Sequence, residues 1–498
     1  MESRMIRLER LVAQNFRCFD LLDLRLGAKM GTPEDVHSGL TVIVAQNGQG
    51  KTAILDAIRY LLGRFVARFG KIATPLPRES DFRSFAFPRE GKARIALGSD
   101  NGTTGETAEI DLSEAKFEIQ SNYMGLTGFL RTGKDSESAD LPWVRWDMIR
   151  RKDKTENTKR IVEEQGMGLG SKFLWPYVDE YIISDCGHNP LVYPVIAYYG
   201  TDRRLARQKP GPISAMGKKD LRKNMYIGCL HAGLNYKRLV EWMFKLENKQ
   251  LREAQERKDF DYVPLEKQTI ELAMRRMLPN FSNLRTTTGS LNLQVDVEED
   301  GAVNARLVDE QLSDGFKIVL TMVFDIVVRI LEGNARLEGM TPERLLETPG
   351  IVLIDEIDLH LHPSWQQRIV PDLRRAFPNI QFVVTTHSPQ VVSSVPKECL
   401  RIIDHGRVRA FSTQTEGVES QMILAQIFGV HAVAPENEWG RRLDRYAKLL
   451  TQGAENSEEC VRLSEELDGH YGKQYPPLVR IRLLSKIKKH VDEASNHA

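Results

Sequence analysis

Residues Ala45 to Thr52 read A-Q-N-G-Q-G-K-T. They follow the apolar run 40–44, L-T-V-I-V, and precede residues 53–62, whose apolar spacing is that of a helix. A strand, a glycine-rich loop and a helix in this order form a phosphate-binding site, because backbone N–H groups of the loop and of the helix N-terminus point at anionic oxygens. The stretch departs from the pattern G-x-x-x-x-G-K-[ST] at one position, where Ala45 replaces the first glycine.

The loop residues have distinct expected roles. Gly48 and Gly50 let the backbone come close to the phosphates. Lys51 is expected to reach the β- and γ-phosphates, and the Thr52 hydroxyl is expected to hold Mg²⁺. The predicted nucleotide-binding set is Gln46, Asn47, Gly48, Gln49, Gly50, Lys51 and Thr52.

The composition is that of an ordinary globular protein. The chain has 498 residues, of which 41% are hydrophobic and 28% charged, and its net charge of +1 gives no overall field for nucleic acid. None of the five cysteines lies at C-x-x-C spacing, which argues against a zinc site or a disulfide framework. No run of 18 apolar residues and no signal-peptide pattern is present. We therefore expect a soluble, cytoplasmic protein with no membrane partner.

Two further apolar runs end in polar residues. Residues 350–356 read G-I-V-L-I-D-E, which predicts a buried parallel strand with carboxylates at its tip. Asp355 is expected to hold Mg²⁺, and Glu356 to orient or deprotonate the attacking water. Residues 380–389 read I-Q-F-V-V-T-T-H-S-P, which places His387 at the tip of another strand, where it could hydrogen-bond a γ-phosphate.

Two segments flank the acidic strand in the sequence. Residues 311–316, Q-L-S-D-G-F, run into the apolar helix predicted over 318–331 and form a second anion-binding helix start. Residues 357–363 read I-D-L-H-L-H-P. His360 and His362 invite a metal interpretation, but no third ligand lies at suitable spacing, and we predict no metal site there.

Three basic features keep two interpretations each. Arg17, in the turn N-F-R-C-F of residues 15–19, could contact phosphate or be a solvated turn arginine. Residues 143–152, W-V-R-W-D-M-I-R-R-K, could contact nucleic acid or form an amphipathic helix with a basic face. The same two alternatives, nucleic-acid contact or a solvated face, apply to the basic run at Arg480, Arg482, Lys486, Lys488 and Lys489.

The ordered set of motifs resembles the Walker A, signature, Walker B, D-loop and H-loop of ABC-type ATPase heads, in the SMC/RecF/OLD branch, which also carries an N-F-R-x-F turn. The resemblance predicts an α/β fold: an SMC/RecF-like P-loop ATPase head with a helical insertion and a helical C-terminal region. It implies ATP bound between two copies, with Lys51 and Thr52 of one facing the signature of the other. The implied residues are Glu356 and His387 for catalysis, Leu312, Ser313, Asp314 and Gly315 for the signature, Asp358 and His362 for the D-loop, Thr52 and Asp355 for Mg²⁺, and Arg17 with the loop residues for the nucleotide.

The middle and the tail narrow the resemblance. Residues 194–203, P-V-I-A-Y-Y-G-T-D-R, and residues 415–430 are similar to PtuA-like ATPases of bacterial antiphage systems, either the Septu pair or the version attached to a retron. That family implies a separate HNH nuclease subunit, PtuB-like, docked on the ATPase, and we expect the tail to be its docking region. In the retron version it implies a reverse transcriptase and its msDNA as further partners, so that nucleic acid is reached through partners.

The expected organisation follows the motifs. Strands are expected at 6–12, 20–26, 93–97, 108–112, 290–297 and 303–308, a central parallel strand at 191–200, and helices at 235–258, 265–278 and 364–377. The predicted parts are the N-terminal head 1–112, an insertion 113–190, a head strand 191–204, a helical lid or hairpin 205–289, the C-terminal head 290–412 and a helical partner-binding region 413–498.

Three functions fit these motifs. The favoured one is a regulatory ATPase of a defence nuclease complex. The alternatives are a RecF/SMC-like repair ATPase that acts directly on DNA and an OLD-type ATPase-nuclease. The sequence contains no HNH pattern and no TOPRIM-like arrangement of a glutamate and D-x-D, so we expect the chain itself to be no nuclease.

Overall fold

The computed structural model describes two compact units, residues 1–418 and 419–498. The residues it describes are 5–26, 39–46, 48–70, 72, 74–75, 92–96, 107–111, 124–133, 143–150, 178–185, 190–202, 222–234, 236–287, 292–299, 302–409, 411, 413–428, 437–483 and 485.

A six-stranded sheet forms the centre of the first unit, in the order β15-β14-β3-β13-β12-β8. All pairings among β14, β3, β13, β12 and β8 are parallel, and β15 is antiparallel to β14. Their bounds are β3 Leu40–Ala45, β8 Val195–Tyr199, β12 Gly350–Ile354, β13 Ile380–Thr386, β14 Leu400–Asp404 and β15 Arg407–Arg409. Every residue of β3, β8, β12 and β13 is buried, as expected for parallel strands that are covered on both faces. The carboxyl ends of β3, β13 and β12 therefore lie side by side.

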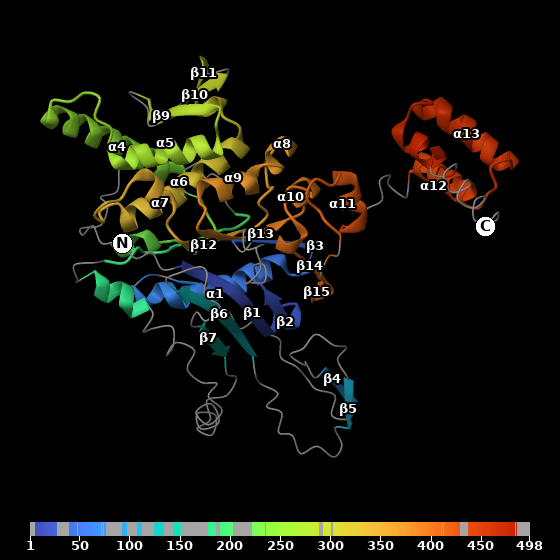
Figure 1. The fold of residues 1–498 in the computed structure, drawn as a ribbon, viewed down its shortest axis with the longest axis horizontal. Helices are drawn as coiled ribbons and strands as arrows, with labels where there is room; N and C mark the ends of the chain where they lie inside the picture. Colours follow the sequence, from blue (N-terminus) through green and yellow to red (C-terminus); the bar gives the residue numbers. More distant parts are fainter. Residues whose placement is uncertain are drawn as a thin grey trace, which may run out of the picture. The chain divides into compact units, whose positions relative to one another are not determined.

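A second, antiparallel sheet has the order β2-β1-β6-β7. Its strands are β1 Met5–Phe16, β2 Phe19–Arg25, β6 Met124–Gly133 and β7 Trp143–Arg150. The helix α1, Lys51–Arg68, lies between this sheet and the central one and packs against strands of both (Figure 1). Its buried residues lie all around the helix, because two layers cover it.

One side chain joins the two sheets directly. Gln381 of β13 is 1% exposed, and its amide nitrogen donates to the carbonyl of Leu8 at 2.8 Å. The Leu8 N–H in turn donates to the Gln381 side-chain oxygen at 2.7 Å. The side-chain amide of Gln381 and the backbone N–H and carbonyl of Leu8 are therefore hydrogen-bonded to each other in the interior, as buried polar groups usually are.

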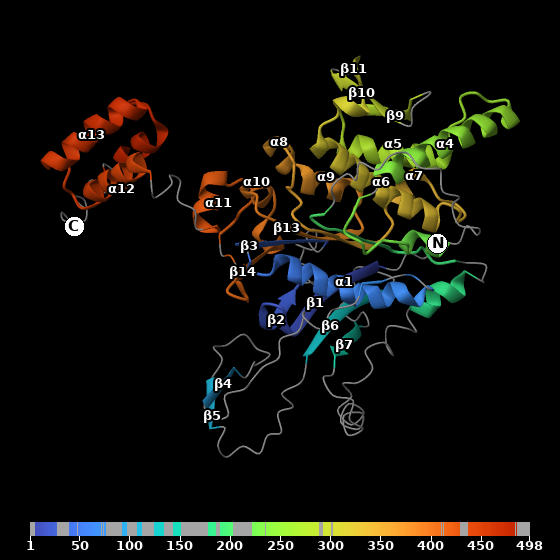
Figure 2. The same cartoon turned by 180° about the vertical axis from the view of Figure 1, so that it is seen from behind.

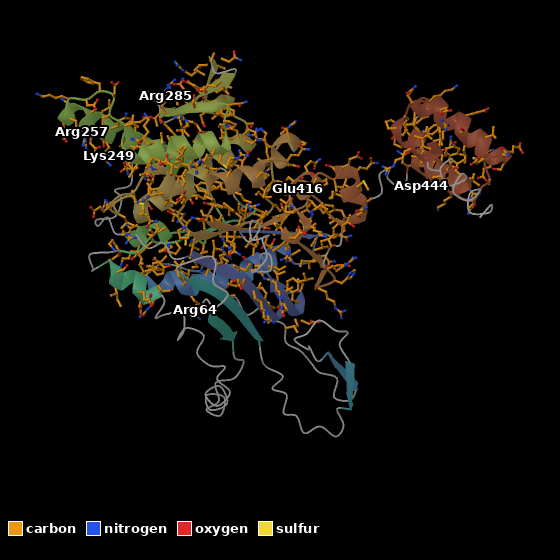
Figure 3. The ribbon with its side chains drawn as sticks, in the orientation of Figure 1. Arg64, Lys249, Arg257, Arg285, Glu416 and Asp444 are labelled. Atoms are coloured by element: carbon orange, nitrogen blue, oxygen red, sulfur yellow. The ribbon has the colours of Figure 1, made fainter. Side chains whose placement is uncertain are left out.

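Helices cover the other face of the central sheet (Figures 1 and 2). They are α4 Tyr236–Arg257, α5 Leu265–Met277, α6 Asp314–Asn334, α7 Pro342–Leu346, α8 Pro363–Gln366, α9 Ile369–Ala376 and α10 Pro389–Val392. The α4–α5 hairpin is held by an ion pair between Lys249 and Glu266 at 2.6 Å and by Arg257, which lies over the Tyr262 ring. Figure 3 labels Lys249 and Arg257 on α4. A small sheet follows it, made of β9 Phe281–Thr286, β10 Leu293–Glu299 and β11 Ala302–Val308.

Most predicted elements are confirmed, and the structure corrects several. Residues 143–150 form the strand β7, so the amphipathic-helix interpretation of 143–152 is wrong for these residues. Both β6 and β7 lie in the range 113–190, where an insertion was predicted. In the structure, β6 pairs with β1 and β7 pairs with β6, so both belong to the same sheet as β1. Strands were expected at 93–97 and 108–112, and the structure has β4 Lys92–Ala96 and β5 Thr107–Asp111, which pair with each other. The strand β9 was not expected.

The strand β8 is parallel as expected but lies at the edge of the sheet, not at its centre. Residues 229–232 cover that edge, since the N–H of Tyr198 donates to the carbonyl of Cys229 and that of Gly200 to Ala232. This cover explains why the edge strand is fully buried and so apolar in sequence. The helix expected over 364–377 is divided into α8 and α9.

The second unit is helical, with α11 Ser420–Gln426, α12 Glu438–Thr451, α13 Glu458–Tyr471 and a further helical stretch over 476–483. Its apolar core holds the predicted tail positions Leu443, Tyr446, Leu449 and Leu450 together with residues of α13. Trp439 stacks on His470 at 3.8 Å between ring centroids.

Candidate nucleotide-binding site

The glycine-rich loop lies between β3 and α1, as the sequence predicted. Gly48 and Gly50 have φ angles of 78° and 92°, in the left-handed region that favours glycine. A side chain at Gly50 would also collide with the Cys18 sulfur and lie 2.6 Å from the Phe19 ring, whereas nothing lies within 4 Å of a Cβ at Gly48. The turn between β1 and β2 therefore packs on the end of the loop. Asn47 lies outside the described residues.

Lys51 is 7% exposed, and its ammonium group donates to the carbonyls of Ala45 at 2.8 Å and Gln46 at 3.2 Å. Burial lowers the pKa of Lys51, and the negative charges of Glu356, Asp355 and Asp358 oppose that lowering. The ammonium thus bridges the loop while facing the carboxylates of the neighbouring strands. A phosphate group could take the place of the two carbonyls as its partner.

The acidic tip of β12 lies against the start of α1. Asp355 is 1% exposed, and its Oδ2 accepts from the Thr52 hydroxyl at 2.8 Å across 303 residues of sequence. A hydroxyl and a carboxylate in contact fit Mg²⁺, which prefers a few protein oxygens completed by phosphate oxygens and water. Within the described ranges, no group of three or more His, Cys, Asp or Glu side chains is placed to hold a metal ion, so neither His360 nor His362 belongs to one.

His387 follows β13, beside Lys51 and the three carboxylates. Burial and the positive charge of Lys51 lower the pKa of His387, against the opposing effect of Glu356, Asp358 and Asp355. The lowered pKa favours the neutral imidazole, which can hydrogen-bond a phosphate oxygen without carrying charge. The Asp358 side chain lies at the end of β13, where its Oδ1 accepts a hydrogen bond from the Thr386 hydroxyl at 2.6 Å.

The signature residues form the start of α6. Ser313 is its N-cap and accepts from the Phe316 N–H at 3.3 Å. Ser313 and Asp314 are exposed, whereas Leu312 and Gly315 are buried. The backbone at Gly315 lies so close to the His360 carbonyl that no side chain fits there. Across the described parts of the chain, no hydrogen bond or ion pair joins residues 312–315 to the loop 45–52.

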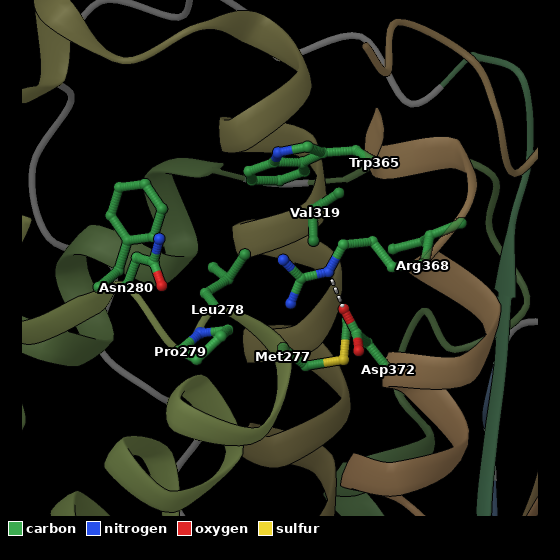
Figure 4. Close-up of a pocket in the computed structure, with 10 residues that line it drawn as sticks. Met277, Leu278, Pro279, Asn280, Val319, Trp365, Arg368 and Asp372 are labelled. Carbon is green, nitrogen blue, oxygen red and sulfur yellow. Dashed lines mark hydrogen bonds and ion pairs between the residues drawn. The ribbon is translucent and has the colours of Figure 1, made fainter. Parts of the chain in front are cut away.

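Two cavities flank the signature helix. One, of about 300 Å³, is lined by the signature and the segment after Glu356: Leu312, Ser313, Gly315, His360, Leu361 and His362, with aromatic side chains around them. His362 is exposed and caps α8. The other, of about 70 Å³, lies between α5, α6 and α9 (Figure 4). Arg368 and Asp372 pair at 2.9 Å on its wall, and none of the predicted phosphate-binding residues lines it.

Arg17 has a left-handed φ of 47° and an ion pair with Asp56 of α1 at 2.7 Å. Its predicted contact with the nucleotide stays a prediction. Gln49 accepts from the His405 N–H at 3.1 Å, a contact between the loop and the β14–β15 turn that the sequence did not indicate. Sequence reasoning also missed Thr385, whose only signal was a hydroxyl at the tip of an apolar run.

Fold and site together define a P-loop ATPase head. A family model described as "AAA domain" matches residues 10–295, and a second AAA-domain model, whose description refers to the AbiEii toxin of type IV TA systems, matches residues 210–393. Because the first match spans more than half of the chain, the chain belongs to the AAA-domain family. The predicted α/β fold class is confirmed, and membership of this family implies nucleotide binding.

Two curated relatives support the narrower resemblance. The chain is 28% identical to "Retron Ec83 probable ATPase" of Escherichia coli over 99% of its length and 89% of that protein. It is 31% identical to "Septu protein PtuA" of Bacillus mycoides (strain KBAB4), over 38% of the chain and 28% of that protein. These matches confirm the predicted likeness to PtuA-like ATPases.

Among solved structures, an SMC head bound to the C-winged-helix domain of ScpA is similar at 15% identity, covering 82% of this chain and 98% of that one, with a TM-score of 0.35. In the part of the chain that the structure describes, no helix has the length and apolar character needed to cross a membrane.

The packing around the loop predicts that Gly48 and Gly50 differ in how well they tolerate replacement by alanine. Gly50→Ala introduces both backbone strain and a collision with Cys18 and Phe19. Strain of this kind costs about 1–3 kcal/mol, and about 1.4 kcal/mol corresponds to tenfold in affinity. ATP affinity should therefore fall at least about tenfold. Gly48→Ala, with open space around it, should lose less. Equilibrium binding of a fluorescent ATP analogue measures both; equal losses in the two variants would contradict the packing of the turn on the loop.

Proposed function

We propose that the chain binds and hydrolyses ATP in sites shared by two copies, and that it does so as the regulatory ATPase of a bacterial antiphage defence complex. The observation that carries the first part is the convergence of Lys51, Thr52, Asp355, Glu356 and His387 at one edge of the central sheet. Groups for binding phosphate, holding a metal and activating water then lie in one place.

Hydrolysis follows from these positions. Lys51 exchanges its loop carbonyls for the β- and γ-phosphates of ATP. Thr52 and Asp355 would hold Mg²⁺, which supplies positive charge to the phosphate oxygens when it is bound. Glu356 takes a proton from a water molecule whose oxygen bonds to the γ-phosphorus, and the bond from that phosphorus to the β–γ bridging oxygen breaks to release ADP. Neutral His387 donates a hydrogen bond to the γ-phosphate as its charge redistributes.

The signature supports a site completed by a second copy. Ser313 and Asp314 are exposed at the N-terminus of a 21-residue helix, an end that favours anions. Among the described residues, the predicted Mg²⁺ and phosphate residues of the same copy make no bond to them, so their phosphate partner is expected on another copy. Asp314 adds a carboxylate near that phosphate, which weakens closure of the dimer or demands an additional cation.

The defence role rests on the relatives. One named for a retron matches nearly the whole chain, and one named for Septu matches part of it. On this basis an HNH nuclease subunit, PtuB-like, is the output of the complex, and the helical unit 419–498 is its docking region. In a retron setting, a reverse transcriptase and its msDNA join the assembly. The ATP-bound head dimer controls the nuclease, and the chain itself cuts no nucleic acid.

Replacing the proposed base should separate binding from turnover. Glu356→Gln keeps the shape of the side chain but cannot accept the proton, so phosphate release should fall about 10²- to 10⁴-fold. ATP and Mg²⁺ should then hold the variant as a dimer in size-exclusion chromatography with light scattering. Glu338→Gln, at an exposed position, is the matched control. Unchanged turnover in Glu356→Gln would remove Glu356 as the catalytic residue.

Mixing two inactive variants tests the shared site. Lys51→Ala should abolish ATP binding, and Ser313→Arg should block the signature. Random pairing makes half of the dimers mixed. Each mixed dimer has one complete site out of two, made of the intact Lys51 of one copy and the intact Ser313 of the other. If the two sites of a two-fold dimer act independently, the mixture should regain about one quarter of wild-type turnover. Each variant alone should stay inactive. A mixture as inactive as its components would argue against a site built from two copies.

The defence proposal is tested by purification from the native host. Tagged chain in Mg²⁺ and ATP should bring down an HNH-fold nuclease, identified by mass spectrometry, with a reverse transcriptase and msDNA where a retron is present. The chain alone should leave DNA intact in Mg²⁺. Recovery of no protein partner, together with stimulation of ATP turnover by naked DNA, would instead support a DNA-repair ATPase.

A further inference from the structure

A buried threonine lies between the metal-binding and the catalytic carboxylates. Thr385 is 0% exposed, near the end of β13. That strand pairs with β12 on one side and with β3 on the other, so its tip lies between the acidic strand and the phosphate loop. None of the sequence motifs assigns Thr385 a role.

Its hydroxyl group contacts both acidic residues at once. The Thr385 hydroxyl donates to Oδ1 of Asp355 at 2.5 Å and accepts from the backbone N–H of Glu356 at 2.7 Å. The Thr385 carbonyl accepts from the N–H of Ile357 at 2.9 Å. The single proton of the hydroxyl and one of its lone pairs are therefore both in use in a buried place.

These bonds fix the rotation of the Asp355 carboxylate. With Oδ1 bound to Thr385, Oδ2 is left for Thr52, whose hydroxyl donates to it at 2.8 Å. Oδ1 of Asp355 is thus bound to the buried Thr385, and Oδ2 is bound to Thr52, which is expected to hold Mg²⁺. Loss of the Thr385 bond would let the carboxylate rotate away from the metal position.

The same bonds hold an unfavourable backbone turn. Glu356 has a φ of 48°, which is left-handed and uncommon for a residue with a side chain. Such conformations persist only where surrounding contacts impose them. The hydroxyl and the carbonyl of Thr385 bond the N–H groups on both sides of this turn, at Glu356 and Ile357, and so direct the Glu356 side chain.

We propose that Thr385 is a positioning residue of the ATPase site, whose hydroxyl orients the Asp355 carboxylate and the Glu356 turn together. This role rests on the proposed ATP hydrolysis. It acts through two other residues and requires no contact between Thr385 and ATP. Its loss should therefore slow turnover more than it weakens binding.

The test compares substitutions that differ in one hydroxyl group. Thr385→Val keeps the shape and removes both hydrogen bonds, and kcat should fall about 100-fold, the loss expected for a displacement of roughly 1 Å, while the Kd for ATP changes less than about threefold. The magnesium concentration needed for half-maximal turnover should rise. Thr385→Ser restores the hydroxyl and should return kcat to within about threefold of wild type.

The matched control is Thr348→Val. Thr348 is 1% exposed, and its hydroxyl has no hydrogen-bond partner among the described residues. Its replacement should leave kcat, ATP affinity and magnesium dependence unchanged. Should Thr385→Val fail to fold by circular dichroism and thermal unfolding, Thr385→Cys serves as a second variant, close to serine in shape but a weaker hydrogen-bonding group.

Three results would overturn the role of Thr385: unchanged kcat in the folded Val or Cys variant, equal losses in the Ser and Val variants, or a fall in kcat matched by an equal loss of ATP affinity. Failure of the proposed function would look different, because wild-type chain would then neither bind nor hydrolyse ATP. In that case no dependence of catalysis on Thr385 could exist, and the inference would fall with it.

Discussion

The buried amide of Gln381 joins the central sheet to the antiparallel sheet that contains β1. Pairing of β1 with β2 begins at Arg10, so Leu8 lies beyond the end of β2 on that side. Its N–H and C=O would remain without partners in the protein interior, at a cost of about 1–3 kcal/mol each. Gln381 supplies one acceptor and one donor, both within 2.8 Å. The polar side chain of Gln381 is thus satisfied inside a buried strand because it completes the backbone hydrogen bonding of another strand.

This connection also determines how the phosphate loop is built. Once β1 is fixed against β13, the turn at residues 17–19 lies on Gly50, and Arg17 reaches Asp56 of α1. The loop is then held from outside as well as by its own lysine. A buried ammonium needs polar partners, and Lys51 finds them in two loop carbonyls. The loop can therefore keep its shape before a phosphate replaces those carbonyls.

The predictable part of the site is the part that depends on parallel strands. Apolar runs that end in Asp355, His387 and the glycine-rich loop identify strand tips, and parallel pairing must bring such tips to one edge. Pairing across long stretches has no such local signal. The strands β6 and β7 join the sheet of β1 from more than 100 residues away in the sequence. The edge strand β8 has the apolar sequence of a central strand because residues 229–232 cover its edge. Thr385 and Gln381 were missed for a related reason, since their partners lie far away in the sequence, after β12 and in β1.

The segment after the acidic strand connects the two halves of the proposed composite site. It starts at Glu356, which Thr385 holds, continues through Asp358, which Thr386 holds, and ends at His360, whose carbonyl lies against Gly315 of the signature. Glu356 and His360 both have left-handed backbone angles, so the segment is a tight, internally constrained turn and not a loose loop. Hydrogen bonds fix its first part, and at its end the His360 carbonyl packs against Gly315. In the proposed shared site, a displacement of Glu356 at one nucleotide would therefore press on the signature that serves the other. If two copies share their sites as proposed, residues 356–360 would link those sites without any long-range element.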